Sequence, residues 1–284
     1  YGDMQLIAEA YDLLRSVGGL SNDELAEVFT RWNEGELQSF LIEISARIFR
    51  TRDPEDASGL GFLVDKVLDS SGMKGTGKWT VQDAIELSVP VPTIASSVDA
   101  RVISSDKKGR VRNSQILKGP SPHTMDAAAK QHLIDDVRQA LYCAKACSYA
   151  QGMQLLSVAS RTRGWNLPFG EIAKIWRGGC IIRAQFLGRI QAAFDRDSTL
   201  PNLLLDPGFV DEISVRNAAW RRVVALGASA GVPLLATSGA LSYYDMIRRE
   251  RLPANLIQSQ RDLFGAHTYE RTDKAGSFHS EWAK

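Results

Sequence analysis

The residues of this 284-residue chain best suited to chemistry include Arg261 and His267, which stand six positions apart near the C-terminus. Pro253 is tolerated in the first turn of a helix, and Gly265 predicts the end of that helix. Apolar residues recur between them at helical spacing and leave Arg261 on another face; they are Leu256, Ile257, Leu263 and Phe264. An arginine and a histidine at a helix end can bind an anion together. The alternative is a solvated arginine and an ordinary histidine.

A second candidate is the glycine-rich run 72–80, which resembles a phosphate-binding loop until its last position. That motif needs Ser or Thr directly after its lysine to reach magnesium, and Trp79 stands there instead. We therefore reject a nucleotide site. The glycines still allow a ligand to approach the backbone, where Lys74 offers a point charge and Thr76 a hydroxyl. The alternative is a tight turn that leads into a helix capped by Thr80.

Two further segments carry charge or adjacent glycines. Arg101 falls near the end of a predicted helix, 93–104, where an arginine can simply complement the helix dipole. The block 176–183 contains Gly178 and Gly179 beside apolar residues. We predict that these two glycines serve close packing between helices rather than catalysis.

Helices must position these candidates, because strand signals are almost absent and apolar residues recur at helical spacing along most of the chain. Ser21 and Glu24 form a capping box, and Thr80 with Asp83 is predicted to cap a later helix. A pattern of nearly forty residues, 125–163, predicts one long and largely buried helix. Other helices are expected at 4–17, near Glu171, and at 182–194, 207–227 and 235–249. The fold class is therefore all-α.

A weak internal repeat predicts two related helical halves. Residues 4–7 resemble residues 153–156, and two later matches keep the same order at a nearly constant offset. These are Glu24-Leu25-Ala26 with Glu171-Ile172-Ala173, and Phe40-Leu41 and Ile44 with Phe186-Leu187 and Ile190. The charged segment 107–123 is the best candidate for an internal linker. We predict one large multi-helix domain, 1–284, with an extended C-terminal tail.

Composition excludes several classes of protein. Lys and Arg number 34 and Asp and Glu 33, so there is no broad basic face and nucleic acid is not expected as a partner. No apolar run reaches the roughly 20 residues that span a bilayer, so a membrane protein is not expected either. Three cysteines without metal-ligand spacing favour a reducing, cytoplasmic setting and no metal. Cys143 and Cys147, one helical turn apart, are expected in the core.

Motifs at four places, in one order, resemble a known family. They are Tyr1-Gly2-Asp3-Met4-Gln5-Leu6, Lys74-Gly75-Thr76-Gly77 with Trp79, the block 176–183, and the run 252–267. With them the chain resembles 6-phosphogluconate dehydrogenase, the decarboxylating enzyme of the pentose phosphate pathway, over essentially its whole length. The resemblance implies the family's all-helical C-terminal domain and a homodimer in which the tail of one subunit reaches the other.

The resemblance also implies a binding site for 6-phosphogluconate. Its phosphate and sugar contacts fall on four residues: Tyr1, Lys74, Thr76 and Arg101. Arg261 and His267 correspond to residues supplied by the neighbouring subunit. The substrate carries a phosphate and a carboxylate, so several cationic donors suit it. NADP is the implied cofactor, bound mainly by an N-terminal dinucleotide-binding domain that the resemblance places outside this chain.

The family's catalytic groups also fall outside the chain according to this resemblance. The general-base lysine and the general-acid glutamate would both lie just upstream of Tyr1, so no catalytic residue is expected within it. The chain also opens directly into a helical pattern, which indicates a fragment of a longer protein. We therefore expect no dehydrogenase activity from the chain alone.

Two other functions stay open at this point. One is the helical domain of another hydroxyacid dehydrogenase, although such domains are shorter and lack the repeat. The other is a non-catalytic helical interaction module with an unused basic pocket. Binding of 6-phosphogluconate would separate these possibilities, because only the first interpretation requires selectivity for a sugar acid phosphate.

Overall fold

The computed structural model describes residues 1–122 and 125–282, and it divides the chain into two compact units, Tyr1–Tyr243 and Tyr244–Lys284. The helices that begin in the first unit are α1 (Gly2–Ser16), α2 (Asn22–Trp32), α3 (Phe40–Arg50), α4 (Thr76–Glu86), α5 (Pro92–Ser105), α6 (Lys107–Ile116), α7 (Ala127–Arg163), α8 (Phe169–Ile175), α9 (Phe186–Arg196), α10 (Pro207–Ala230) and α11 (Leu235–Ile247). Two short 3-10 helices accompany them, η1 (Leu63–Lys66) and η2 (Leu203–Leu205). The second unit holds α12 (Ala254–Gly265) and an antiparallel pair, β1 (Tyr269–Glu270) and β2 (Ser277–Phe278). The predicted all-α class is confirmed.

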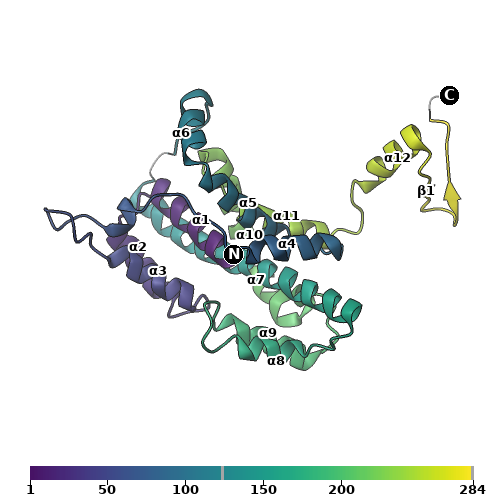
Figure 1. Cartoon of the computed structure of the whole chain (residues 1–284), viewed down its shortest axis with the longest axis horizontal. Coiled ribbons are helices and arrows are strands. Elements are labelled where there is room, and N and C mark those ends of the chain that lie inside the picture. The colour runs from purple at the N-terminus through teal and green to yellow at the C-terminus, as the bar shows by residue number, and fades with distance from the viewer. Residues whose placement is uncertain (123–124, 283–284) are drawn as a thin grey trace. The chain divides into compact units, whose positions relative to one another are not determined.

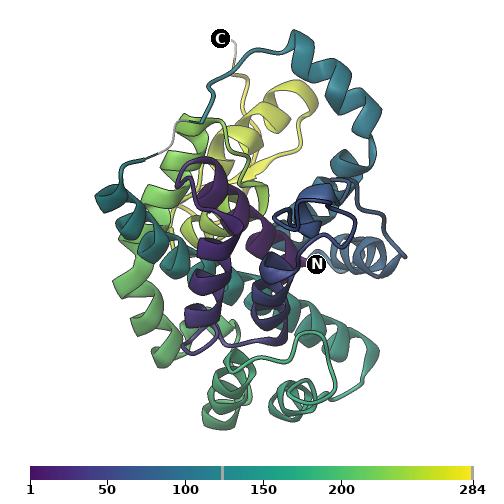
Figure 2. The same ribbon diagram turned by 90° about the vertical axis from the view of Figure 1, so that its left-hand side faces the viewer.

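Helix α7 is the centre of the first unit. It runs for 37 residues, close to the predicted span, and packs against α1 and α10 (Figures 1 and 2). Asp126 caps its first turn, and Gly164 ends it in a left-handed conformation that favours glycine. Cys143 and Cys147 are fully buried, as predicted. Burial raises the pKa of Cys143 to about 12, so this thiol stays protonated and acts as an apolar core residue.

Two pairs of packed helices lie next to each other in the first unit. Helix α2 packs on α3, and α8 packs on α9 (Figure 1). An isolated antiparallel bridge joins Ser39, just before α3, to Ala184, just before α9. Main-chain hydrogen bonds of 2.9 and 3.0 Å flank this bridge. The bridge thus joins the two segments that directly precede the matched residues Phe40 and Phe186.

Two predictions around α4 and α6 are wrong. Helix α4 begins at Thr76, so Thr80 is not a cap; its hydroxyl instead donates to the Thr76 carbonyl at 2.8 Å. The predicted linker 107–123 contains α6, whose start is capped by Asp106 through the Gly109 N–H at 2.9 Å. Within that segment, residues 117–122 lack regular structure, and His123 lies outside the described residues.

The prediction for Gly178 and Gly179 is also wrong. A Cβ atom at either position would meet no atom within 4 Å, so these glycines do not serve close packing. Gly179 has a φ of 65°, a left-handed conformation that glycine adopts without strain. The segment around it is a turn, and α9 accordingly starts at Phe186 rather than at 182.

Asp262 organises the second unit. Its buried carboxylate accepts hydrogen bonds from the N–H groups of Thr268 and Ser280, both at 3.0 Å, and from Trp282 Nε1 at 2.8 Å. His279 Nδ1 lies 2.9 Å away. Burial by itself raises the pKa of Asp262, but the hydrogen bonds from His279, Trp282 and Ser280 outweigh it and hold the pKa at about 2. One carboxylate thus fastens the extended tail to α12.

Candidate functional site

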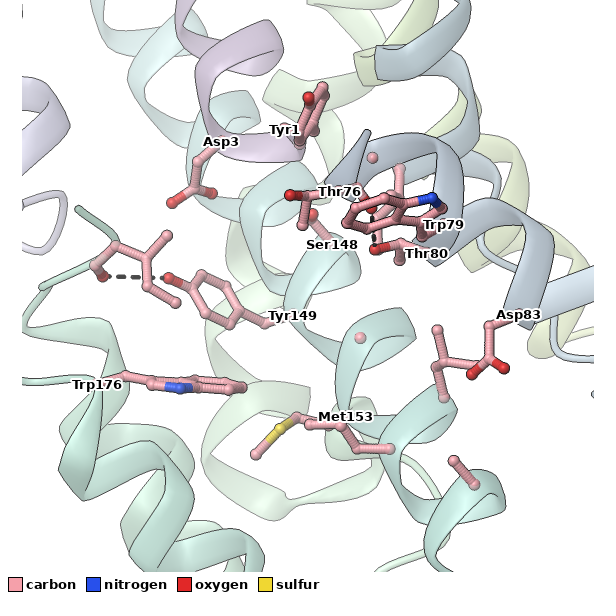
Figure 3. Close-up of a pocket in the computed structure, with 18 of the residues that line it drawn as sticks. Tyr1, Asp3, Thr76, Trp79, Thr80, Asp83, Ser148, Tyr149, Met153 and Trp176 are labelled. Atoms are coloured by element: carbon pink, nitrogen blue, oxygen red, sulfur yellow. Dashed lines mark hydrogen bonds between the residues drawn. The ribbon is translucent and has the colours of Figure 1, made fainter. Parts of the chain in front are cut away.

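A cavity of about 750 Å³ opens in the first unit among α1, α4, α7 and the segment around Trp176. Its wall is largely apolar, and five aromatic residues contribute to it: Tyr1, Trp79, Tyr149, Trp165 and Trp176. Trp176 and Tyr149 lie across the opening from Trp79 and Asp83 (Figure 3). Two of the predicted substrate-binding residues, Tyr1 and Thr76, line the same cavity.

Tyr1, Thr76 and Arg101 come together at one edge of this cavity. The Arg101 guanidinium carbon lies 4.1 Å from the centre of the Tyr1 ring, a cation–π contact. Arg101 Nη2 also lies 3.5 Å from the Met4 sulfur. Gly77 follows Thr76 and sits against the tyrosine, because a Cβ atom there would be 2.8 Å from the ring. Helices α1, α4 and α5 therefore position these side chains by direct contact.

Lys74 is exposed in the irregular segment that precedes α4, two residues before Thr76. It is not part of the cavity wall. Among residues 1–122 and 125–243, neither Lys74 nor Arg101 forms an ion pair with a carboxylate. Carboxylates that line the cavity are neutralised instead. Uncompensated positive charge at this edge favours an anionic ligand.

The charged residues of the cavity wall are paired with one another or with the core. Asp83 of α4 forms an ion pair with Arg163 at the end of α7. Asp3 is 8% exposed and pairs with Lys145 of α7, which is 4% exposed, at 3.2 Å. Burial strongly raises the pKa of Tyr149, whose hydroxyl lies 3.4 Å from the Ile182 carbonyl and stays protonated. These groups shape the cavity rather than add charge to it.

The residues that form the wall of the cavity were not predicted from the sequence as a group. A lysine within the apolar stretch 141–150 is a signal that could have identified Lys145 as a buried partner. The aromatic residues gave no such signal, because they come from separate segments that only the fold brings together.

Arg261 and His267 lie at the end of α12, in the second unit. Arg261 Nη1 donates to Gln258 Oε1 at 3.0 Å, and the His267 ring meets the Phe264 ring edge-on at 5.9 Å. Ala266 and Thr268, on either side of His267 in the sequence, have φ values of 48° and 61°, a left-handed conformation uncommon outside glycine. The predicted helix is confirmed as α12, and the joint binding of an anion by Arg261 and His267 stays a prediction.

The described residues were compared with what a metal site and a membrane-spanning helix require. Across 1–122 and 125–282, no group of three His, Cys, Asp or Glu residues could hold a metal ion. Over the same ranges, no helix combines the length and the apolar character needed to cross a bilayer.

An all-helical domain with a large and mainly apolar cavity has the form of a helical domain that holds a small molecule. Comparison with known families is more specific. The model of the 6-phosphogluconate dehydrogenase C-terminal domain matches residues 1–282, so the chain belongs to this family.

Several proteins of known name are similar to the chain. A decarboxylating 6-phosphogluconate dehydrogenase of Spinacia oleracea is 60% identical, covering all of this chain and 59% of the relative. An enzyme of that name from Synechococcus elongatus is 56% identical over 99% of this chain and 59% of its own length. A chloroplastic relative from Arabidopsis thaliana is 58% identical and is covered to 59%. The chain thus spans about three fifths of the curated relatives it matches.

A solved structure from Plasmodium falciparum shares the fold, with a TM-score of 0.92 and 43% identity. It covers 99% of this chain, which in turn covers 60% of that structure's chain. Its title describes 6-phosphogluconate dehydrogenase in an apo form, with its cofactor NADP+ and with its substrate 6-phosphogluconate.

Proposed function

We propose that this chain is the substrate-binding and dimerisation domain of an NADP-dependent 6-phosphogluconate dehydrogenase. The complete protein would oxidise and decarboxylate 6-phosphogluconate to ribulose 5-phosphate. Family membership, relatives of 56% to 60% identity and the substrate named for the Plasmodium structure support this proposal. The proposal also holds that residues 1–284 act as one functional domain.

The observation that carries the proposal is the pair of unpaired cations beside Tyr1 and Thr76. Lys74 supplies a flexible point charge, while Arg101 supplies a planar fork whose face is stacked on Tyr1. Thr76 places a hydroxyl at the start of α4, where helix N–H groups also favour an anion. Together these groups would bind the phosphate and sugar hydroxyls and orient the substrate.

NADP does not fit the residues described in this chain. Dinucleotides bind at the ends of parallel strands beside a glycine-rich turn, and the sheet of the described residues is one antiparallel pair of two-residue strands. We therefore propose that NADP binds mainly to residues of the full-length protein that lie outside this chain. We assign no catalytic residue within it.

The proposal includes a homodimer whose active sites are shared between subunits. Four apolar residues on α12 are between 59% and 72% exposed: Leu256, Ile257, Leu263 and Phe264. A contiguous apolar helix face of this kind marks an interaction surface. Arg261 and His267, at the end of the same helix, would then serve the partner's substrate. A cytoplasmic location stays a prediction, since the relatives include chloroplastic proteins.

Neither alternative function has comparable support. Another hydroxyacid dehydrogenase would not share 56% to 60% identity with enzymes of this name along the whole chain. A non-catalytic interaction module has no requirement for uncompensated cations beside a 750 Å³ cavity.

The test is Lys74→Ala in the full-length protein. Loss of a charge-assisted hydrogen bond costs about 1.5–3 kcal/mol, so the KM for 6-phosphogluconate should rise by roughly 10- to 150-fold while the KM for NADP stays the same. Lys66→Ala is the matched control, because it removes an exposed lysine from the nearby η1. Equal KM values for the two variants would contradict the proposal.

A further inference from the structure

Residues 67–75, which carry Lys74, have no regular structure. A flexible lysine on an unsupported loop would lose much conformational freedom when it binds an anion. The hydrogen bonds and ion pairs that fasten this segment therefore matter for its function. Among the described residues, the side-chain hydrogen bonds and ion pairs of this segment lead to the end of α5 and to α6.

Asp69 is the main attachment point of the loop. Lys107 Nζ lies 2.6 Å from its Oδ1, and Arg110 Nη1 lies 2.9 Å from its Oδ2. Arg110 Nη2 also donates to the main-chain carbonyl of Asp69 at 2.7 Å. The hydrogen bonds from Lys107 and Arg110 hold the pKa of Asp69 at about 2, so the carboxylate is ionised at neutral pH.

The same contacts reach the helix that carries Arg101. Arg110 Nη2 donates to the Ser104 carbonyl at 3.1 Å, so one guanidinium joins the loop to the end of α5. The Ser71 N–H donates to the Ser104 hydroxyl at 3.1 Å, and that hydroxyl donates to the Arg101 carbonyl at 2.8 Å. One connected set of polar contacts thus joins the loop to the end of α5 and to α6; its residues are Asp69, Ser71, Ser104, Lys107 and Arg110.

Helix α6 has few apolar contacts that could hold it in place. Gly109 is its one buried residue, and Val111 and Ile116 are 48% and 67% exposed. It therefore adds almost nothing to the apolar core, and its attachment to the domain rests on polar contacts such as those of Lys107 and Arg110.

We propose that α6 positions the substrate-binding lysine: Arg110 and Lys107 hold Asp69 against the end of α5 and thereby fix Lys74 relative to Arg101. This inference rests on the proposed function, because it assigns Lys74 and Arg101 to one substrate anion. Arg110 and Lys107 are positioning residues, since their contacts are with the loop and α5 and not with the ligand. Preorganisation of this kind lowers the cost of ordering a site on binding.

The first experiment is Arg110→Ala in the full-length protein, assayed with 6-phosphogluconate. The KM for this substrate should rise by about threefold to tenfold, which lies within the roughly 2- to 30-fold effect expected when a coupled residue is removed, with little change in the KM for NADP or in Tm. Lys108→Ala and Arg112→Ala are matched controls, because they remove the same charge from exposed positions of the same helix. An equal rise in the controls would overturn the inference, since general attraction of the anion would then explain it.

Two further variants show whether a change in KM comes from loss of the contacts that Arg110 makes, from loss of its charge, or from misfolding. Arg110→Lys keeps the charge but lacks the second nitrogen that reaches the Ser104 and Asp69 carbonyls, so its KM should stay raised; a wild-type KM would overturn the inference. Asp69→Asn leaves α6 unaltered and removes both ion pairs, so it should also raise the KM. It serves as the decisive variant if Arg110→Ala does not fold.

A double variant distinguishes this inference from the proposed function. If α6 acts through Lys74, then Arg110→Ala should change the KM little further when Lys74 is already alanine. Effects that simply multiply would overturn the inference. If Lys74→Ala alone leaves the KM unchanged, the proposed function and the inference both fail. If Lys74→Ala raises the KM and neither Arg110→Ala nor Asp69→Asn does, only the inference fails.

Discussion

Gly77 leaves the space that the Tyr1 ring occupies, and the ring in turn supports the Arg101 guanidinium. Each member of this stack restrains the next, so the Arg101 guanidinium is held by an aromatic ring rather than by a carboxylate. An arginine that stacks without an acidic partner keeps its charge available for a ligand.

Gly77→Ala should therefore displace the Tyr1 ring and disturb Arg101. We expect the KM for 6-phosphogluconate in the full-length protein to rise by on the order of tenfold, because even a small displacement of a binding group weakens its contact with the substrate. Helix stability should not fall, because alanine is the better helix residue. Gly72→Ala is the control, since a Cβ atom there meets nothing within 4 Å. A Gly77→Ala protein with an unchanged KM would show that the ring position is irrelevant to binding.

Only some of these residues could be predicted from the sequence. Glycines on both sides of Lys74 and Thr76 indicated a ligand approach, and the structure does place Thr76 at the cavity. The aromatic wall could not be predicted, because Trp79, Trp165 and Trp176 converge through tertiary packing and not through any local pattern.

Helices were predictable where an apolar periodicity or a cap marks them. The long α7 and the capping box of α2 follow directly from their residues. Helix α6 was mistaken for a linker, because a helix held by ion pairs has no apolar stripe to show in the sequence. Thr80 was mistaken for a cap, because the helix start depends on Gly75, whose φ is 113°.

Helix α11 has an unusual cap from a distant part of the chain. The buried carboxylate of Glu9, on α1, accepts hydrogen bonds from the Ala236 and Thr237 N–H groups at 2.8 and 2.9 Å and from the Thr237 hydroxyl at 2.7 Å. Glu9→Ala leaves these donors buried without partners, so the free energy of unfolding should fall by on the order of 2–4 kcal/mol. Urea denaturation checks this, with Glu34→Ala as an exposed control. Equal stability of both variants would contradict it.

The second unit should respond to acid through Asp262. Its pKa is lowered in the folded state from 3.8 to about 2, so the stability that it adds is complete above about pH 4 and is lost as the pH falls through 2. The Trp282 indole N–H donates to this carboxylate at 2.8 Å. Its NMR resonance should therefore titrate with a midpoint near pH 2, and Asp262→Asn should abolish the titration. A midpoint at 3.8 would show that the carboxylate is not held by these donors.

The assembled protein offers a test of the shared active site. Full-length chains with Lys74→Ala are combined with full-length chains with His267→Ala, and the activity of the heterodimer is measured. If the sites are shared, one site of each heterodimer is intact and the other carries both lesions, so about half of the wild-type activity should return. If each site used one chain only, every site would carry one lesion and mixing would restore nothing.

The bridge between Ser39 and Ala184 bears on the ancestry of the chain. Its hydrogen bonds join main-chain groups, so they place no demand on the identity of the side chains, and the two halves could diverge without losing the contact. This explains why the repeat is faint in the sequence although α3 and α9 have 11 residues each. The paired segments stand directly before α3 and α9, and two copies of one segment that meet across a two-fold axis also pair in antiparallel fashion. If the two halves arose by duplication, this bridge has the geometry of a contact between two half-length chains.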